Sequence, residues 1–262
     1  MPAAVLCDLD GVVWLARQAL PGAPEAVSAL RVAGVRVVFV TNNSAAPLAE
    51  QEAALDAIGI PARGDVITSA IAAAHLIAPG ERVMVCGGPG VAEAVTRRGA
   101  QPVAGDDDTG GPVDAVVVGF HTDFDYTRLR IAATAVLAGA RLIGTNDDPT
   151  YPTPAGPIPG GGSILAAVAT ASGVAPTIAG KPYGPMAATV LAELEGLDPT
   201  TLLMVGDRPS TDGRFAVALG CPFALVRSGV TAPGVPVEPR PDIDAADLAA
   251  VAALVIAADQ RE

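Results

Sequence analysis

The most reactive pattern in the chain lies within its first eleven residues. Asp8 and Asp10 stand two residues apart directly after an apolar run, and Gly11 follows them. Side chains two apart in a strand share a face, and glycine allows a sharp turn. We therefore expect both carboxylates at the carboxyl end of a strand, where open α/β sheets bind ligands. Such close acids repel each other and call for a cation or a proton, and Mg²⁺ prefers oxygen ligands of this kind. The plain alternative is a strand-end turn with two solvated aspartates.

Three later segments also place polar groups where a predicted strand ends or a helix begins. Thr41-Asn42-Asn43 follows a predicted strand at 35–40, and Gly180-Lys181-Pro182 precedes an amphipathic helix. Asp207 and Asp212 follow a predicted strand at 202–205. Together with Asp8 and Asp10, these segments supply hydroxyl and amide donors, one ammonium group and two further acids. That set suits a phosphoryl group in transfer, which needs positioning and charge stabilisation.

In this order, the four segments closely resemble the motifs of the haloacid dehalogenase (HAD) superfamily of phosphatases. The chain is similar to the group typified by p-nitrophenyl, phosphoglycolate, glycerol-phosphate and NagD phosphatases, and the match covers nearly the whole chain. Two positions depart from the family pattern. Gly213 stands where an apolar residue is usual, which we expect to loosen the start of the following helix. The run Gly160-Gly161-Gly162-Ser163 carries an extra glycine.

The resemblance implies an α/β fold, with a Rossmann-like parallel-sheet HAD core and an inserted α/β cap of the C2 type. The alternating strand and helix patterns show a second α/β block within the chain, and with the resemblance they predict the core at residues 1–68 and 179–262 and the cap at residues 69–178. A chain of 262 residues is long enough for two domains. Half of the residues are hydrophobic and only 3% are aromatic, so we expect cores of Ala, Val, Leu and Ile.

The acids and the lysine receive distinct roles. Asp8 is the expected nucleophile, because a carboxylate that attacks phosphorus splits one hard displacement into two. Asp10 is the expected general acid and base. Asp207 is expected to complete a Mg²⁺ site with Asp8, and the resemblance implies that Asp10 contributes its backbone carbonyl. Asp212 either supports the metal or orients Lys181, with an N-cap for the next helix as the alternative. Lys181 is expected to neutralise charge on the phosphoryl group and on Asp8.

The remaining candidates bind phosphate or substrate. Gly11 supports the turn after the two acids, and Thr41 and Asn42 are expected to hold phosphate oxygens through hydroxyl, amide and backbone N–H groups. An ordinary strand-to-helix turn is the alternative there. Asn43 and four residues of the cap are candidates for substrate contact: His121, Asp123, Asn146 and Asp147. A surface loop explains His121 and Asp123 equally well, whereas the resemblance implies that Asn146 and Asp147 belong to a loop facing the active site.

Composition excludes several other functions. A formal charge of −12 disfavours a nucleic-acid-binding surface. The N-terminus lacks the features of a signal peptide, and the longest apolar run, 248–258, is too short to span a bilayer. Cys7, Cys86 and Cys221 form no CxxC pair, so we expect buried thiols in a reducing cytoplasm.

The sequence thus predicts a Mg²⁺-dependent phosphatase that acts on a small phosphorylated metabolite through an aspartyl-phosphate. Glycerol phosphate, phosphoglycolate, a nucleoside monophosphate and a sugar phosphate all remain open as substrates, and p-nitrophenyl phosphate would serve as an artificial one. One alternative is a catalytically silent protein that binds a phosphorylated ligand, and another is a phosphotransferase or mutase on the same core. Caps of this type often dimerise in the family, which leaves a homodimer through the cap open.

Overall fold

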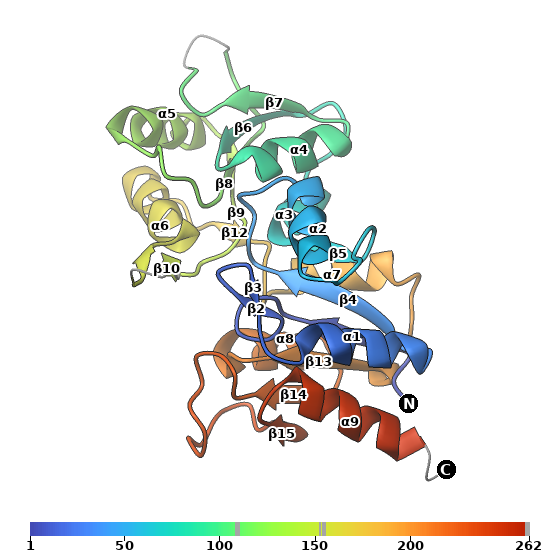
Figure 1. Cartoon of the computed structure of the whole chain (residues 1–262). Helices are drawn as coiled ribbons and strands as arrows, with labels where there is room; N and C mark the ends of the chain where they lie inside the picture. The colour runs from blue at the N-terminus through green and yellow to red at the C-terminus, as the bar shows by residue number, and fades with distance from the viewer. Residues whose placement is uncertain (108–110, 152, 154–155, 260–262) are drawn as a thin grey trace. The chain divides into compact units, whose positions relative to one another are not determined.

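The protein forms two compact units, each built around a sheet of its own (Figure 1). This computed structural model describes residues 1–107, 111–151, 153 and 156–259. The core unit comprises Met1–Thr41, Ala49–Ile67 and Lys181–Glu262, and the inserted unit comprises Asn42–Leu48 and Thr68–Gly180. The predicted α/β fold class is confirmed. The cap borders at 69 and 178 stay a prediction, and the structure groups the short segment Asn42–Leu48 with the inserted unit.

The core unit contains a six-stranded sheet in the order β15-β14-β13-β1-β4-β5. The pairings of β4 with β1, β1 with β13, β13 with β14, and β14 with β15 are all parallel. The central strand β1 is fully buried, which explains its unbroken apolar sequence. A short antiparallel hairpin, β2–β3, follows β1. The strands are β1 Ala4–Cys7, β2 Trp14–Leu15, β3 Gln18–Ala19, β4 Arg36–Thr41, β5 Val66–Thr68, β13 Leu202–Gly206, β14 Phe223–Val226 and β15 Ile243–Ala245.

Four helices of the core unit pack against one another in two pairs. Helix α1 packs against α9, and α7 packs against α8. The chain crosses from β1 to β4 in one direction and from β13 to β14 in the other, so right-handed crossovers place α1 and α8 on opposite faces. The elements are α1 Ala23–Val32, α2 Leu48–Ala57, α7 Gly184–Glu193, a 3₁₀ turn Pro199–Thr201, a π-helical turn Pro209–Gly213, α8 Arg214–Leu219 and α9 Leu248–Asp259.

The register of the core sheet brings three predicted site segments to one edge. Cys7, the last residue of β1, lies opposite Val205 of β13 and Phe39 of β4. The residues that follow, Asp8, Asp207 and Thr41, therefore gather where these parallel strands end. This edge is where an open α/β sheet binds its ligands.

The inserted unit has a five-stranded sheet in the order β12-β9-β8-β6-β7, and every neighbouring pair in it is parallel. Helices α5 and α6 pack against each other and bury aliphatic side chains of β6, β8 and β9. The elements are α3 Ser69–His75, β6 Arg82–Cys86, α4 Pro89–Arg97, β7 Gln101–Ala104, β8 Ala115–Val118, α5 Tyr126–Leu137, β9 Arg141–Gly144, β10 Thr150–Tyr151, β11 Ile158–Pro159, α6 Gly161–Ser172 and β12 Thr177–Ile178. Among the described residues, no helix combines the length and the apolar character that a membrane crossing needs.

Candidate active site

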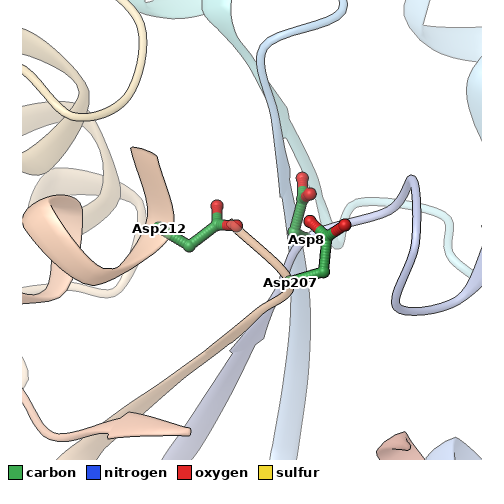
Figure 2. Close-up of side chains that lie close together, drawn as sticks. All are labelled: Asp8, Asp207 and Asp212. Atoms are coloured by element: carbon green, nitrogen blue, oxygen red, sulfur yellow. The ribbon is translucent and has the colours of Figure 1, made fainter. Parts of the chain in front are cut away.

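Three carboxylates gather at the edge of the core sheet. Asp8 and Asp207 project from the ends of the neighbouring strands β1 and β13, and Asp212 points toward them from the π-helical turn (Figure 2). One oxygen from each acid lies within 4.8 Å of the others. Asp207 and Asp212 are buried, at 4% and 1% exposure. The structure thus brings together residues that are almost two hundred positions apart in the sequence, as the parallel register requires.

Lys181 is the buried cation of this cluster and the only lysine in the chain. Its ammonium group donates to Asp8 Oδ1 at 2.7 Å and to Asp212 Oδ1 at 2.8 Å, and only 2% of its side chain is exposed. Burial alone would lower its pKa, but the two ion pairs outweigh burial and raise the pKa above its usual value. The ammonium group therefore stays charged where it touches the predicted nucleophile.

The acids of the cluster carry more charge than Lys181 balances. Burial, followed by repulsion from Asp212 and Asp8, raises the pKa of Asp207 to about 7. Burial also raises the pKa of Asp212 to about 6, in spite of its contact with Lys181. When Asp8, Asp207 and Asp212 are all ionised, a single ammonium group faces three negative charges. The remaining excess of two charges matches a divalent cation, and carboxylate oxygens are ligands that Mg²⁺ prefers.

Asp10 lies beyond this cluster, in the turn between β1 and the β2–β3 hairpin. Its pKa is raised to about 6, first by burial and second by repulsion from Asp8. A hydrogen bond from the Trp14 side chain partly opposes this shift, and the Gly11 N–H, which donates to the Trp14 carbonyl at 2.8 Å, closes the turn. A pKa near neutrality suits a group that gives and takes protons at physiological pH.

The carboxylate of Asp212 is fully engaged by two donors. Lys181 donates to Oδ1, and the Arg208 N–H donates to Oδ2 at 3.1 Å. The N-cap alternative is not what the structure shows, because α8 begins after Gly213 without a side-chain cap. A Cβ at Gly206 would overlap the side chain of Asp212, so the glycine before Asp207 makes room for that acid. Asp212 therefore contacts Lys181 through one carboxylate oxygen and the Arg208 backbone through the other.

The predicted phosphate-binding residues belong to different units. Thr41 is buried, with 3% exposure, at the end of β4 in the core unit. Asn42 belongs to the inserted unit, where its Nδ2 donates to Asp148 Oδ2 at 3.0 Å. The Asn42 carbonyl accepts from Ser69 Oγ at 2.7 Å and from Asn146 Nδ2 at 2.8 Å. The side chain of Asn42 is thus held by the inserted unit.

Asn42 and Asn146 belong to one hydrogen-bonded network, and Asp148 is a member that the sequence analysis missed. The Asp148 N–H donates to Asn146 Oδ1 at 3.1 Å, and Asn146 is buried, whereas Asp147 is exposed. Asn43 lies close by and donates from Nδ2 to Tyr151 Oη at 3.3 Å. No motif pointed to Asp148, and only its place one residue after Asp147 could have suggested it.

His121 and Asp123 form a second network in the inserted unit. His121 Nδ1 lies 2.8 Å from Asp123 Oδ1, and Arg128 donates to Asp123 Oδ2 at 2.8 Å. The Cys86 thiol lies 3.7 Å from His121 Nε2. Burial raises the pKa of this thiol to about 12. The two predicted residues thus contact each other, and Arg128 and Cys86 extend the network on either side.

The two glycine departures have packing reasons. A Cβ at Gly213 would lie 2.8 Å from Pro239 Cγ and 3.0 Å from Phe223 Cε1, so the place of the usual apolar side chain is filled from elsewhere in the core unit. Helix α8 begins at the next residue, Arg214, directly after the π-helical turn, and a looser start of this helix stays a prediction. A Cβ at Gly162 would lie 2.7 Å from the Asp148 carbonyl oxygen and would overlap the Asp147 backbone. Gly162, one glycine of this run, therefore lets α6 approach the 147–148 backbone.

Comparisons with known proteins identify the family of this chain. A family model described as haloacid dehalogenase-like hydrolase matches residues 5–101, and a second HAD-hydrolase-like model matches residues 178–251. An acid sugar phosphatase from Staphylococcus saprophyticus is 36% identical over 232 residues, which cover 87% of each chain. The chain belongs to the haloacid dehalogenase-like hydrolases. The predicted family and the predicted enzyme class, a phosphomonoester hydrolase, are confirmed by these relatives.

Other members of the family are similar over most of this chain. A D-glycerol 3-phosphate phosphatase from Mycobacterium tuberculosis is 41% identical over 86% of this chain, which spans only 63% of that relative's length. A crystal structure of glycerol phosphate phosphatase from that organism, in complex with magnesium, has a TM-score of 0.85 at 39% identity and covers 94% of this chain and 76% of its own. The structure of a p-nitrophenyl phosphatase from Archaeoglobus fulgidus has a TM-score of 0.87 at 28% identity. The match covers 97% of this chain and 99% of that phosphatase.

Proposed function

We propose that this chain is a magnesium-dependent phosphatase of small phosphomonoesters in which Asp8 is the nucleophile. The observation that carries the proposal is the buried ammonium group of Lys181, held between Asp8 and Asp212 beside Asp207. A structural ion pair needs one acid for one lysine, whereas this cluster gathers three. The named activities of the relatives support the same reaction class.

Magnesium fits the cluster by charge and by ligand type. Asp8 and Asp207 would hold the cation through carboxylate oxygens, and the Asp10 carbonyl is the third predicted ligand. Asp212, with both oxygens engaged by Lys181 and Arg208, would support the site through Lys181. When bound, the cation offsets the repulsion between the phosphate group and the acids around it.

In the first step, an oxygen of Asp8 attacks the phosphorus atom, and the bond between phosphorus and the ester oxygen breaks. Lys181 holds the attacking carboxylate in place and offsets part of the charge that accumulates on the phosphoryl group. Asp10, whose raised pKa of about 6 makes its protonated form accessible near neutral pH, gives its proton to the departing alkoxide. The products are the alcohol and an aspartyl-phosphate on Asp8.

In the second step, Asp10 takes a proton from a water molecule as that water attacks phosphorus. The bond between phosphorus and Asp8 breaks, inorganic phosphate leaves, and Asp8 is regenerated as a carboxylate. The proton that Asp10 lost in the first step is thereby restored. Thr41, buried at the end of β4, is the proposed hydroxyl donor to phosphate in both steps, and Asn42 remains a predicted phosphate ligand through its backbone N–H.

We further propose that the inserted unit selects the alcohol part of the substrate. Every proposed catalytic residue lies in the core unit, which can recognise only the phosphate that all candidate substrates share. His121, Asp123 and the loop around Asn146 supply polar groups suited to a hydroxylated leaving group. Glycerol 3-phosphate and sugar phosphates are the first candidates, because the relatives named above act on such compounds.

The proposal is tested with a panel of about a hundred phosphorylated metabolites, in Mg²⁺ and with release of inorganic phosphate as the readout. Asp8→Asn protein is the control for contaminating phosphatases. We expect Mg²⁺-dependent release from glycerol 3-phosphate or a sugar phosphate and none from the variant. Ligand binding without phosphate release would favour a silent binding protein. Transfer of the phosphoryl group to a second metabolite, without free phosphate, would favour a transferase or mutase.

A cytoplasmic location and a homodimer through the cap stay predictions. Cys7 and Cys86 are buried free thiols, as expected, whereas Cys221 is a free thiol that is only partly buried. Sedimentation of the purified protein over a range of concentrations tests for the dimer.

A further inference from the structure

The 228–231 loop, which follows β14, holds Asp207 from a part of the chain that no predicted motif includes. The Val230 N–H donates to Asp207 Oδ2 at 2.6 Å. The Thr231 hydroxyl donates to the Asp207 backbone carbonyl at 2.6 Å. The loop therefore binds both the side chain and the main chain of one acid of the cluster.

Gly229 makes this contact possible by leaving space. A Cβ at position 229 would overlap Oδ2 and Cγ of Asp207 and would lie 2.6 Å from its Cβ. These are atoms of a buried acid, which cannot move aside as the end of a flexible surface chain can. Gly229 does not have a left-handed backbone conformation, so the position requires glycine for its size.

A second glycine, Gly11, meets the same oxygen from another loop. A Cβ at Gly11 would overlap Asp207 Oδ2 and would lie 2.9 Å from the Cα atom of Gly229. The Ser228 hydroxyl donates to the Gly11 carbonyl at 2.7 Å and ties the two loops together. Asp207 Oδ2 is thus enclosed by two glycines and held by one backbone N–H.

We propose that the 228–231 loop is a positioning element for Asp207, which fixes Oδ2 and so presents Oδ1 to the divalent cation. This inference rests on the proposed function, in which Asp207 is a metal ligand. A ligating carboxylate held by an outer hydrogen bond needs no reorientation when the cation binds, and removal of such partners typically lowers metal affinity by about 10- to 100-fold. Gly229, Val230 and Thr231 touch neither the cation nor the substrate in this proposal, and they act only through Asp207.

The test is isothermal titration of each purified variant with Mg²⁺ alone. Gly229→Ala should weaken Mg²⁺ binding by about 10- to 100-fold, and Thr231→Val, which is nearly isosteric, should weaken it several-fold. Gly184→Ala is the matched control, because its φ is ordinary and nothing lies within 4 Å of the added Cβ. We expect the control to bind Mg²⁺ as the parent does. A loss of folded protein lowers the binding stoichiometry, whereas a positioning effect changes the dissociation constant.

Asp207→Asn separates the failure of this inference from the failure of the proposed metal site. If Asp207→Asn binds Mg²⁺ as the parent does, Asp207 is not a metal ligand. Both the proposed metal site and the positioning role of the 228–231 loop are then refuted. If Asp207→Asn loses binding while Gly229→Ala and Thr231→Val keep the parent's dissociation constant, the metal site stands and the positioning role is refuted. If circular dichroism shows that Gly229→Ala does not fold, the test rests on Thr231→Val alone. A dissociation constant for Mg²⁺ equal to that of the parent then refutes the positioning role. As a second readout, the Mg²⁺ concentration for half-maximal rate should rise in both loop variants, with kcat at saturating Mg²⁺ changing much less.

Discussion

Replacement of Lys181 by methionine tests the charge balance on which the proposed mechanism depends. Methionine keeps the unbranched shape of the lysine stem and removes the ammonium group. In the metal-free protein this leaves Asp8 and the buried Asp212 without the cation that both contact at 2.7–2.8 Å. Breaking a buried ion pair in this way costs about 3–5 kcal/mol. For a chain of this size, 1 kcal/mol corresponds to roughly 2–4 °C in Tm, so we expect Tm to fall by roughly 6–20 °C at pH 8.

The loss of stability should depend on pH in a defined direction. Asp212 has a pKa of about 6 even with Lys181 beside it, and removal of the ammonium group can only raise that pKa further. At pH 5 the acid is then neutral in the variant, so the cost of burying it without a cation largely disappears. The difference in Tm between Lys181→Met and the parent should therefore be much smaller at pH 5 than at pH 8, as measured by calorimetry in chelator.

Arg214→Met is the control for this experiment. Arg214 is an exposed cation at the start of α8 in the same unit, and its loss should change stability by no more than about 0.5 kcal/mol. Phosphatase activity of Lys181→Met should fall by about 10²–10³-fold even in saturating Mg²⁺. The reasoning is refuted if Lys181→Met and Arg214→Met have the same Tm at both pH values, or if Lys181→Met retains activity within about tenfold of the parent.

Because the chain has one lysine, [¹⁵N]lysine labelling of the parent gives a single ammonium signal, and this ammonium group should stay protonated at pH 10.

Three further outcomes follow from the site and its surroundings. Asp8→Asn should fold normally but lose at least about 10⁴-fold in phosphate release, and near-native turnover would rule out Asp8 as the nucleophile. In chelator, Asp207 and Asp212 have raised pKa values of about 7 and 6, so the folded protein binds more protons than the unfolded chain and Tm should fall as pH rises from 5 to 8. Added Mg²⁺ should flatten that profile, and a Tm that rises with pH in chelator would contradict the assignment. Burial raises the pKa of Cys7 and Cys86 from 9.0 to about 12, so both thiols should react with a thiol reagent at pH 8 roughly a thousandfold more slowly than in denaturant.

The sequence predicted the acids of the site because local rules determine their placement. Apolar runs predicted β1 and β13, parallel strands end at one edge, and the residues after each strand must meet there. This argument predicts that Asp8, Asp207 and Thr41 meet at that edge, and the resemblance to the HAD motifs supplied their roles. The alternation of elements predicted a second α/β block, which contains a parallel sheet of its own, whereas only the resemblance to the family identified this block as an inserted cap.

Contacts that depend on the packing of distant loops could not be predicted in this way. Nothing in the local pattern around Asn42 indicates that its amide donates to Asp148, more than a hundred residues later. The same is true of Gly229, which resembles any loop glycine until the side chain of Asp207 is placed against it. A glycine needed for a left-handed turn can be suspected from its neighbours, but a glycine needed for space depends on what the rest of the fold puts there.

Gly213 shows how such packing can preserve a site when its motif changes. The space next to the α carbon of Gly213 is occupied by Phe223 of β14 and by Pro239 of the segment before β15. The π-helical turn that carries Asp212 therefore ends in close packing despite its glycine, and Asp212 keeps both of its hydrogen bonds. A larger residue at 213 would have to displace Pro239. Gly213→Leu, which restores the usual apolar type of the family, should for this reason destabilise the chain by about 1–3 kcal/mol, as expected for overpacking. A calorimetric Tm equal to or above that of the parent would show that Pro239 and Phe223 can make room for the larger side chain.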